Sequence, residues 1–399
     1  MTERADFQKL VPAFEDAFGS ADGRRLLAVR APGRTEIAGN HTDHEGGNVI
    51  AAAVDRYVEG IFSPADGQLM RVSSEGYGLV EVRIDECEAR DDERGTTAAL
   101  VRGMAAQFKE RGFEPKGFEA SVRSDVLGGS GLSSSAAFEL ELGQAMNALW
   151  ADGVLSPKDL ALMAQRAERE WFGKPCGLMD QAAVALGGIQ HMNFSDPKRL
   201  KATELDFDFA EHGFVVCIIA VGADHAANID DYAAVPAEMQ AVARALGKQV
   251  LSEVTGEEVI AALPRLREEL GDRAPLRALH YFNEELLVER RAEVLRAGDM
   301  HRFMTYTRYS GASSAMLLQN VSVGGASEQP SMLAIALAES LLSGNGVARV
   351  HGGGFGGTIQ AFVPTDWAAS FAKGMDAVFG EGACGIYDVD HEGAQAWWM

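Results

Sequence analysis

A glycine- and serine-rich segment near the end of the first third of the chain constrains its fold more than any other feature. It reads Gly128-Gly129-Ser130-Gly131-Leu132-Ser133-Ser134-Ser135-Ala136-Ala137. Glycines allow close backbone approach and left-handed dihedral angles. The serines fall where a helix is expected to begin, so that unpaired N–H groups and the positive end of the helix dipole face outward. The segment can therefore hold a phosphate group, although no lysine completes a P-loop pattern. The alternative is a turn followed by a serine-capped helix.

The hydrophobic pattern on either side of this segment predicts a protein of mixed helices and strands. Strands are predicted at Leu26–Arg30, Val54–Phe62, Leu69–Ser73, Leu79–Ile84, Gly117–Val126, Val215–Val221, Val347–Val350 and Thr358–Val363. Helices are predicted from Ser133 towards Trp150, from Ser156-Pro157 to Gly173, and at Pro236–Leu246, Glu284–Ala297 and Met300–Leu318. Because strands and helices do not alternate regularly, we expect an α+β fold in two lobes, residues 1–200 and 201–399.

The charge balance limits the partners. The 399 residues carry 36 Lys and Arg against 58 Asp and Glu, a formal net charge of −22. Nucleic acids and anionic membranes are bound by clustered basic residues, so neither is expected as a partner. The polar N-terminus, the lack of an apolar stretch of about 20 residues and the four cysteines without a C-x-x-C pair indicate a cytoplasmic protein. A monomer or a homodimer is expected, and the sequence does not distinguish the two. An anionic substrate would need locally placed cations, helix dipoles or a metal ion.

Two further segments are candidate parts of a binding site. Residues 31–44 follow a predicted strand and bring Arg, Asn, His and Asp together, which are side chains suited to sugar hydroxyl groups. The alternatives are a surface loop with exposed His41 and His44, or a metal site that lacks an evident third ligand. Residues 352–357 formally fit G-x-G-x-x-G, but a strand rather than a helix is predicted after them. A tight loop packed near a ligand is therefore favoured over a dinucleotide site.

Together and in this order, these segments resemble the motifs of the GHMP kinase superfamily, and within it the galactokinases. The matching stretches are Gly33–His44, Gly129–Ala136 and Gly352–Gly357, and Ala167–Gln181 is similar to the family segment ending in C-G-I-M-D-Q. The resemblance implies an N-terminal lobe like the second domain of ribosomal protein S5, a C-terminal α+β lobe, and an active site between them. It also implies transfer of the γ-phosphate of ATP to the anomeric C1 hydroxyl of galactose, with Mg²⁺ present.

The same resemblance implies roles for individual residues. Asp180 would face the C1 hydroxyl with Arg34 beside it, and Ser135 and Glu168 would hold Mg²⁺. ATP would lie along Gly128, Gly129, Ser130, Gly131, Leu132, Ser133, Ser134 and Ser135. Contacts with the sugar would come from Asn40, His41, Asp43, Gly177, Asp180, Tyr232, Gly353 and Gly354. On the residues alone, Asp180 could instead cap a helix beginning at Gln181, and Glu168 could be a solvated helix residue.

The first motif departs from the family pattern at three positions. Glu36, Asn40 and His44 replace the family's Asn, Glu and Tyr. The family's Glu accepts a hydrogen bond from the 6-hydroxyl of the sugar, and an amide at that place would tolerate a C6 carboxylate that a Glu would repel. Galactose is the expected substrate, and galacturonate or arabinose is the alternative. A sensor that binds sugar and ATP without catalysis is a further alternative, although the serine run, Asp180 and Glu168 are intact.

Overall fold

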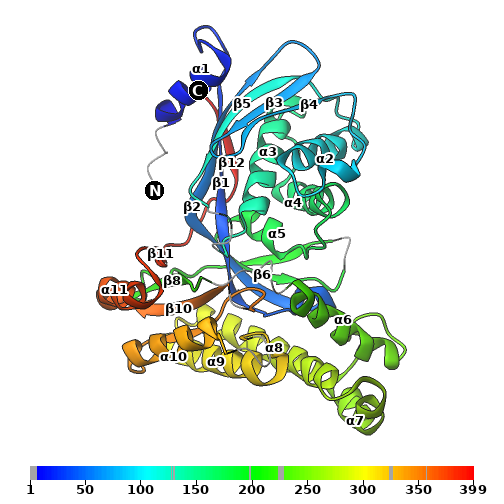
Figure 1. Ribbon diagram of the computed structural model, residues 1–399, viewed down its shortest axis with the longest axis vertical. Helices are drawn as coiled ribbons and strands as arrows, with labels where there is room; N and C mark the ends of the chain where they lie inside the picture. The colour runs from blue at the N-terminus through cyan, green and yellow to red at the C-terminus, as the bar shows by residue number, and fades with distance from the viewer. Residues whose placement is uncertain are drawn as a thin grey trace.

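The computed structural model describes residues 7–126, 128, 131–196, 199–222, 229–322, 327–355 and 357–399. Within this part of the chain, two β-sheets lie in an N-terminal and a C-terminal lobe (Figure 1). The predicted α+β class is confirmed. The polar N-terminus and the predicted ATP-binding residues Gly129 and Ser130 lie outside the described residues.

The first sheet has the strand order β12-β1-β2-β5-β3-β4, and β6 and β7 extend it beside β2. Its strands are β1 (Leu27–Ala38), β2 (Asn48–Pro64), β3 (Leu69–Ser74), β4 (Gly78–Arg83), β5 (Phe118–Ser124), β6 (Ile189–Asn193), β7 (Lys201–Leu205) and β12 (Gln395–Trp398). Neighbouring strands are antiparallel except for β3 and β5. Because β12 pairs with β1, the predicted boundary at residue 200 leaves two strands of this sheet, β7 and β12, on its far side.

Four helices cover one face of this sheet (Figure 1), namely α2 (Thr97–Glu110), α3 (Ser134–Trp150), α4 (Pro157–Ala167) and α5 (Met179–Leu186). Helix α4 begins where predicted, with Pro157 in its first turn and Ser156 accepting a hydrogen bond from the N–H of Asp159. Helix α2 is not predicted by the sequence patterns. Its residues from Ala99 to Phe108 are all buried, and they include the polar residues Arg102 and Gln107. On the other face, α1 (Val11–Phe18) packs Phe14 against Ala28 and Ile61.

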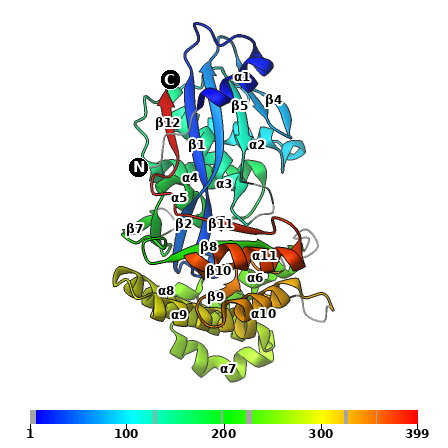
Figure 2. The ribbon, with the colours of Figure 1, turned by 90° about the vertical axis from the view of Figure 1, so that its left-hand side faces the viewer.

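The second sheet is antiparallel, with the order β11-β8-β10-β9 (Figure 2). Its strands are β8 (Phe214–Ala220), β9 (Val347–Val350), β10 (Thr358–Pro364) and β11 (Cys384–Tyr387). The helices of this lobe are α6 (Ile229–Ala245), α7 (Gly256–Leu270), α8 (Arg273–Arg296), α9 (Met300–Ser313), α10 (Pro330–Leu342) and α11 (Ala368–Phe379). Helix α6 includes most of the helix predicted around Pro236–Leu246 but begins earlier, at Ile229, so that Pro236 lies in its interior. Among the described residues, no helix is long and apolar enough to cross a membrane.

One hydrophobic core joins the two lobes. It contains Val29 of β1, Leu140 of α3, Phe303 of α9 and Phe362 of β10. The rings of Phe303 and Phe362 lie 4.9 Å apart edge to face. Because close-packed interiors have low compressibility, this core holds β1 in a fixed position relative to the second sheet.

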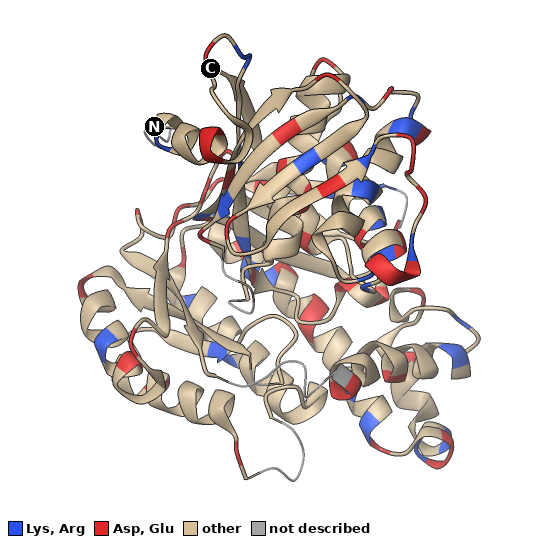
Figure 3. Ribbon diagram, turned by 45° about the horizontal axis from the view of Figure 1, so that its top comes forward, with Lys and Arg blue, Asp and Glu red and all other residues tan. Residues whose placement is uncertain are grey.

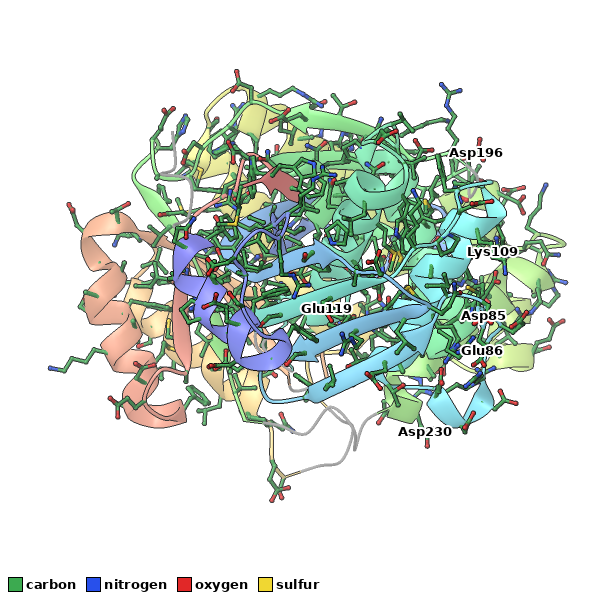
Figure 4. The ribbon with its side chains drawn as sticks, turned by 90° about the horizontal axis from the view of Figure 1, so that it is seen from above. Asp85, Glu86, Lys109, Glu119, Asp196 and Asp230 are labelled. Carbon is green, nitrogen blue, oxygen red and sulfur yellow. The ribbon has the colours of Figure 1, made fainter. Side chains whose placement is uncertain are left out.

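Charged residues of both signs are interspersed over the molecule (Figure 3). Asp85, Glu86 and Lys109 lie together at the outer side of the N-terminal lobe, and Glu119 lies on its sheet (Figure 4). The acidic excess is thus spread over the surface rather than gathered at one place. A site for an anionic substrate must therefore supply its own cations.

Candidate active site

Strand β1 carries the first charged residue of the site. It runs to Ala38, so residues 31–38 are strand and the predicted loop is confined to residues 39–44. The register against β2 shifts between Pro32 and Gly33 and again between Glu36 and Ala38. Such bulges accommodate a proline within a paired strand, because the missing N–H and the local bend coincide. The shift at Gly33 brings the next residue, Arg34, against the glycine- and serine-rich segment, and its N–H donates to the carbonyl oxygen of Leu132 over 3.0 Å.

Arg34 and Asp180 form a bidentate pair between β1 and the first turn of α5. Arg34 Nε lies 2.7 Å from Asp180 Oδ1, and Nη2 lies 2.8 Å from Oδ2. Burial by itself would raise the pKa of Asp180, but the Arg34 charge and hydrogen bonds, with smaller effects from Lys174 and Ser133, lower that pKa to about 2. Asp180 is therefore ionised at neutral pH. Its carboxylate does not cap a helix, because α5 begins at Met179 and the carboxylate oxygens point to Arg34.

The same pair is tied to the start of α3. Ser133 adopts a left-handed conformation with φ of 59°, and its Oγ donates to Asp180 Oδ2 over 2.6 Å. Arg34 Nη1 donates to the carbonyl oxygen of Gly131. Helix α3 begins at Ser134, within one residue of the prediction. The helix N-terminus, with its unpaired N–H groups, thus opens beside the Arg34–Asp180 pair.

A π-helical turn supplies the next group. Helix α4 continues into a π-helix at Glu168–Phe172, and Gly173 ends it with φ of 87°. The N–H groups of Gly173 and Lys174 both donate to the carbonyl oxygen of Glu168, over 2.9 and 3.1 Å. The chain therefore folds back so that Lys174 Nζ lies 2.8 Å from Glu168 Oε1. Ser135 Oγ donates to the same oxygen over 2.7 Å.

The Glu168 carboxylate is 1% exposed, so the alternative of a solvated helix residue is wrong. Gln181 Nε2 donates to its second oxygen over 2.8 Å. Lys174 is a site residue that sequence reasoning misses. Its only sequence signal is a lysine six residues after Glu168, and its contact depends on the π-helical turn.

The loop after β1 faces the glycine loop between β9 and β10. His41 Nε2 lies 3.0 Å from the carbonyl oxygen of Gly353, and the His41 and Tyr232 rings lie 5.4 Å apart. Burial, with a smaller effect from His44, lowers the pKa of His41 to about 3, so the ring is neutral. A neutral ring can donate from Nε2 to that carbonyl. The alternative of an exposed His41 is wrong, because 4% of it is accessible.

Two glycines make room for larger side chains at this place. A Cβ atom on Gly353 would lie 2.3 Å from Cε2 of Tyr232, and a Cβ atom on Gly177 would lie 1.9 Å from Oδ2 of Asp43. Tyr232 and Asp43 therefore rest directly against glycine backbone. Tyr232 also interacts electrostatically with the Arg34–Asp180 pair. It contributes to the raised pKa of Arg34, and burial, Asp43 and Asp180 raise the pKa of Tyr232 itself.

Asn40 is fully buried and bonded within the protein. Its Nδ2 donates to the carbonyl oxygen of Gly352, and its Oδ1 accepts from Asn320 Nδ2 over 2.8 Å and from Ser314 Oγ over 3.3 Å. A Cβ atom on Gly354 would lie 2.2 Å from the carbonyl oxygen of Asn320, so the glycine loop is also in close contact with the segment around Asn320. Asn40 thus joins the loop after β1 to the glycine loop, and its expected contact with a sugar stays a prediction.

A buried ionic cluster holds the end of β1, and no sequence pattern indicates it. Arg349 Nη2 lies 2.8 Å from Glu36 Oε1 and donates to the carbonyl oxygen of Ile37 over 3.1 Å. Arg291 donates to the same carbonyl over 3.1 Å and pairs with Glu284. Glu36, which departs from the family pattern, therefore serves the interior. The two arginines lie 254 and 313 positions from their partners on β1, out of reach of local pattern reasoning.

The structure thus brings together most of the predicted site residues from five segments. The described residues hold no group of three or more His, Cys, Asp or Glu that could bind a metal, so the metal-site alternative for His41 and His44 is not supported. The glycine loop is followed by strand β10, as predicted, which removes the dinucleotide alternative.

Comparisons with known proteins give the family. Residues 99–188 match the model of the GHMP kinase N-terminal domain, and residues 12–64 match the galactokinase galactose-binding signature. The chain is 33% identical over 356 residues to the galactokinase of Streptomyces coelicolor, covering 87% of this chain and 85% of that protein. This chain belongs to the galactokinase family. The galactokinase of Chloroflexus aurantiacus is 32% identical over 375 residues, which cover 93% of this chain and 91% of that one.

Solved structures support the same fold. The galactokinase of Lactococcus lactis, crystallised with galactose, superposes with a TM-score of 0.81 at 24% identity over 98% of this chain and 100% of that one. A mevalonate kinase superposes with a TM-score of 0.66 at 14% identity, covering 92% of this chain and 99% of the other. The two-lobed GHMP kinase fold implied by the motifs is therefore confirmed.

Proposed function

We propose that this galactokinase-family chain transfers the γ-phosphate of ATP to the C1 hydroxyl of galactose, giving galactose 1-phosphate and ADP. The observation that carries the proposal is the Arg34–Asp180 pair, held within 2.8 Å between the loop suited to a sugar and the N-terminus of α3 suited to phosphate. Sugar and nucleotide bound on either side would meet at this pair.

The chemistry follows from the state of Asp180. Its low pKa makes it a weak base, but phosphoryl transfer passes through a loose transition state in which the attacking hydroxyl keeps its proton until late. The carboxylate accepts the hydrogen bond of the C1 hydroxyl and thereby orients that oxygen towards the γ-phosphorus. The proton passes to Asp180 as the new O–P bond forms and the bond to the bridging oxygen of ADP breaks. Arg34 stabilises the charge that spreads over the transferred group.

The residues around the start of α3 fit a magnesium ion. Ser135 Oγ and Glu168 Oε1 lie 2.7 Å apart, and both are hard oxygen ligands. Mg²⁺ is usually held by one or two such groups together with phosphate oxygens and water, so a larger protein cage is not required. An ammonium group already lies on Glu168 Oε1, which indicates that this oxygen attracts a cation. Mg²⁺ there would neutralise charge on the phosphates.

The remaining predicted site residues belong to this proposal. His41, Asp43, Gly177, Tyr232, Gly353 and Gly354 would surround the sugar, and the segment from Gly128 to Ser135 would lie along ATP. The alternatives are not favoured. A kinase for galacturonate or arabinose depends on Asn40, whose amide is bonded to other parts of the protein. A sensor without catalysis does not account for the complete set formed by Arg34, Asp180, Ser135 and Glu168.

The test is the rate of ADP release with galactose, galacturonate, arabinose and glucose at equal concentrations. We expect galactose to give the highest kcat/KM. A large preference for galacturonate would overturn the proposed substrate, and a lack of sugar-dependent ADP release with every sugar would overturn the kinase assignment.

A further inference from the structure

The phosphate half of the site contains a cation that the proposed mechanism does not use. Lys174 Nζ lies 2.8 Å from Glu168 Oε1 and 3.5 Å from Ser135 Oγ. The Glu168 side chain is 1% exposed, whereas the Lys174 side chain is 50% exposed. The ammonium group therefore lies at the mouth of the site, between a buried carboxylate and solvent.

Arg34 has few donors left for the phosphates beyond the transferred group, because three of its five N–H groups are already bonded within the protein. Its Nε and Nη2 are bonded to Asp180, and its Nη1 is bonded to the carbonyl oxygen of Gly131. Lys174 carries its charge on a flexible four-carbon stem with one close ionic partner. A protein with a net charge of −22 that binds a triphosphate has particular need of such a cation.

Lys174 and a divalent cation would compete for one oxygen atom. Glu168 Oε1 accepts from both Ser135 Oγ and Lys174 Nζ, while Oε2 is taken by Gln181 Nε2. A divalent cation bound by Ser135 and Glu168 would lie beside the ammonium group at Oε1, and the repulsion between the two positive charges would displace the ammonium group. The lysine stem is long enough for the displaced ammonium group to remain near the N-terminus of α3.

We propose that Lys174 is a further nucleotide-binding residue, whose ammonium group occupies the cation position at Glu168 until MgATP binds and then contacts the phosphates. The proposal rests on the function proposed above, since it takes ATP and Mg²⁺ as the ligands. Charge alone then sets two expectations. Without Lys174, metal-free ATP meets the uncompensated carboxylate of Glu168, so its affinity falls. Mg²⁺, in contrast, loses a competitor for that carboxylate.

The test uses three variants of the full chain. Lys174→Met keeps the length of the side chain and removes its charge, and Lys174→Arg keeps the charge. Lys158→Met is the matched control, because Lys158 is exposed on the same helical segment ten residues before Glu168, about 15 Å along the axis. Affinity for ATP is measured by titration calorimetry in excess EDTA. We expect Lys174→Met to weaken it about tenfold or more, Lys174→Arg by no more than about threefold, and Lys158→Met not at all.

A second measurement separates competition from a merely structural role. Free Mg²⁺ is titrated at saturating ATP and sugar, and Lys174→Met is expected to reach half its maximal rate at a lower Mg²⁺ concentration while its kcat falls. Equal affinities of wild type and Lys174→Met for metal-free ATP, or a higher Mg²⁺ requirement in that variant, would overturn the proposal. The calorimetric result does not depend on turnover, so failure of sugar-dependent ADP release in the wild type would refute the kinase assignment separately.

Discussion

Replacing Asp180 with Asn removes the charge beside the reacting hydroxyl and changes little else in shape. Two unit charges about 4 Å apart interact by about 4 kcal/mol at an effective dielectric constant of about 20, so Arg34 loses a strong partner. Asn keeps one oxygen for one Arg34 donor, which limits the loss of folding stability to about 1–3 kcal/mol. Loss of the proton acceptor and orienting carboxylate costs about 10²–10⁴ in rate. We therefore expect kcat to fall about a thousandfold.

Binding and turnover are measured separately for this variant. Sugar binding by calorimetry is expected to change less than about tenfold, since the loop after β1 and the glycine loop make contacts that do not involve Asp180. ADP release gives kcat. Asp92→Asn, which removes the same charge at an exposed position, serves as the control and should behave as wild type. Turnover of Asp180→Asn within about tenfold of wild type would refute the role given to Asp180.

Three further predictions concern the sugar loop, the buried ions and pH. Gly353→Ala places a Cβ atom 2.3 Å from the Tyr232 ring, so KM for galactose should rise about tenfold or more while KM for ATP stays constant. Equal increases in the two KM values would argue against a sugar contact at Gly353. Arg291→Met removes the ion-pair partner of the fully buried Glu284 and should lower the free energy of unfolding in urea by about 3–5 kcal/mol; a loss below about 1 kcal/mol would contradict the pairing. Burial, partly offset by a hydrogen bond from the Leu251 N–H, raises the pKa of Glu45 to about 7. The unfolded chain, with a pKa of about 4.5, loses this proton first, so the free energy of unfolding falls by at most about 3 kcal/mol as the pH rises from about 4.5 to 7. Glu45→Gln should therefore be more stable than wild type at pH 8 and about equal to it at pH 4, whereas a difference that is independent of pH would count against the shift.

The parts of the site that could be predicted from sequence are those whose signal is local. The serine run predicted the start of α3 because capping residues and helix periodicity lie within one segment. The strand after the glycine loop followed from its own apolar run. Asp180 and Glu168 entered through the family resemblance, and the structure supplied the contacts that join them to Arg34 and Ser135.

The parts that were missed have no signal in the local sequence pattern. Arg349 reads as part of a short strand, and its pairing with Glu36 arises when β9 meets β1. Lys174 reads as a surface lysine until the π-helical turn brings it onto Glu168. Helix α2 was also missed, and its buried residues include the polar Arg102 and Gln107, which a hydrophobic pattern does not mark.

The most direct test of the central claim is the identity of the product. The protein is incubated with MgATP and galactose, and the product is examined by ³¹P NMR with phosphorus–proton correlation. We predict a sugar phosphate whose phosphorus couples to the proton on C1, formed in equal amount to ADP and lost in Asp180→Asn. A phosphate on another hydroxyl, or ADP formed without any sugar phosphate, would contradict it.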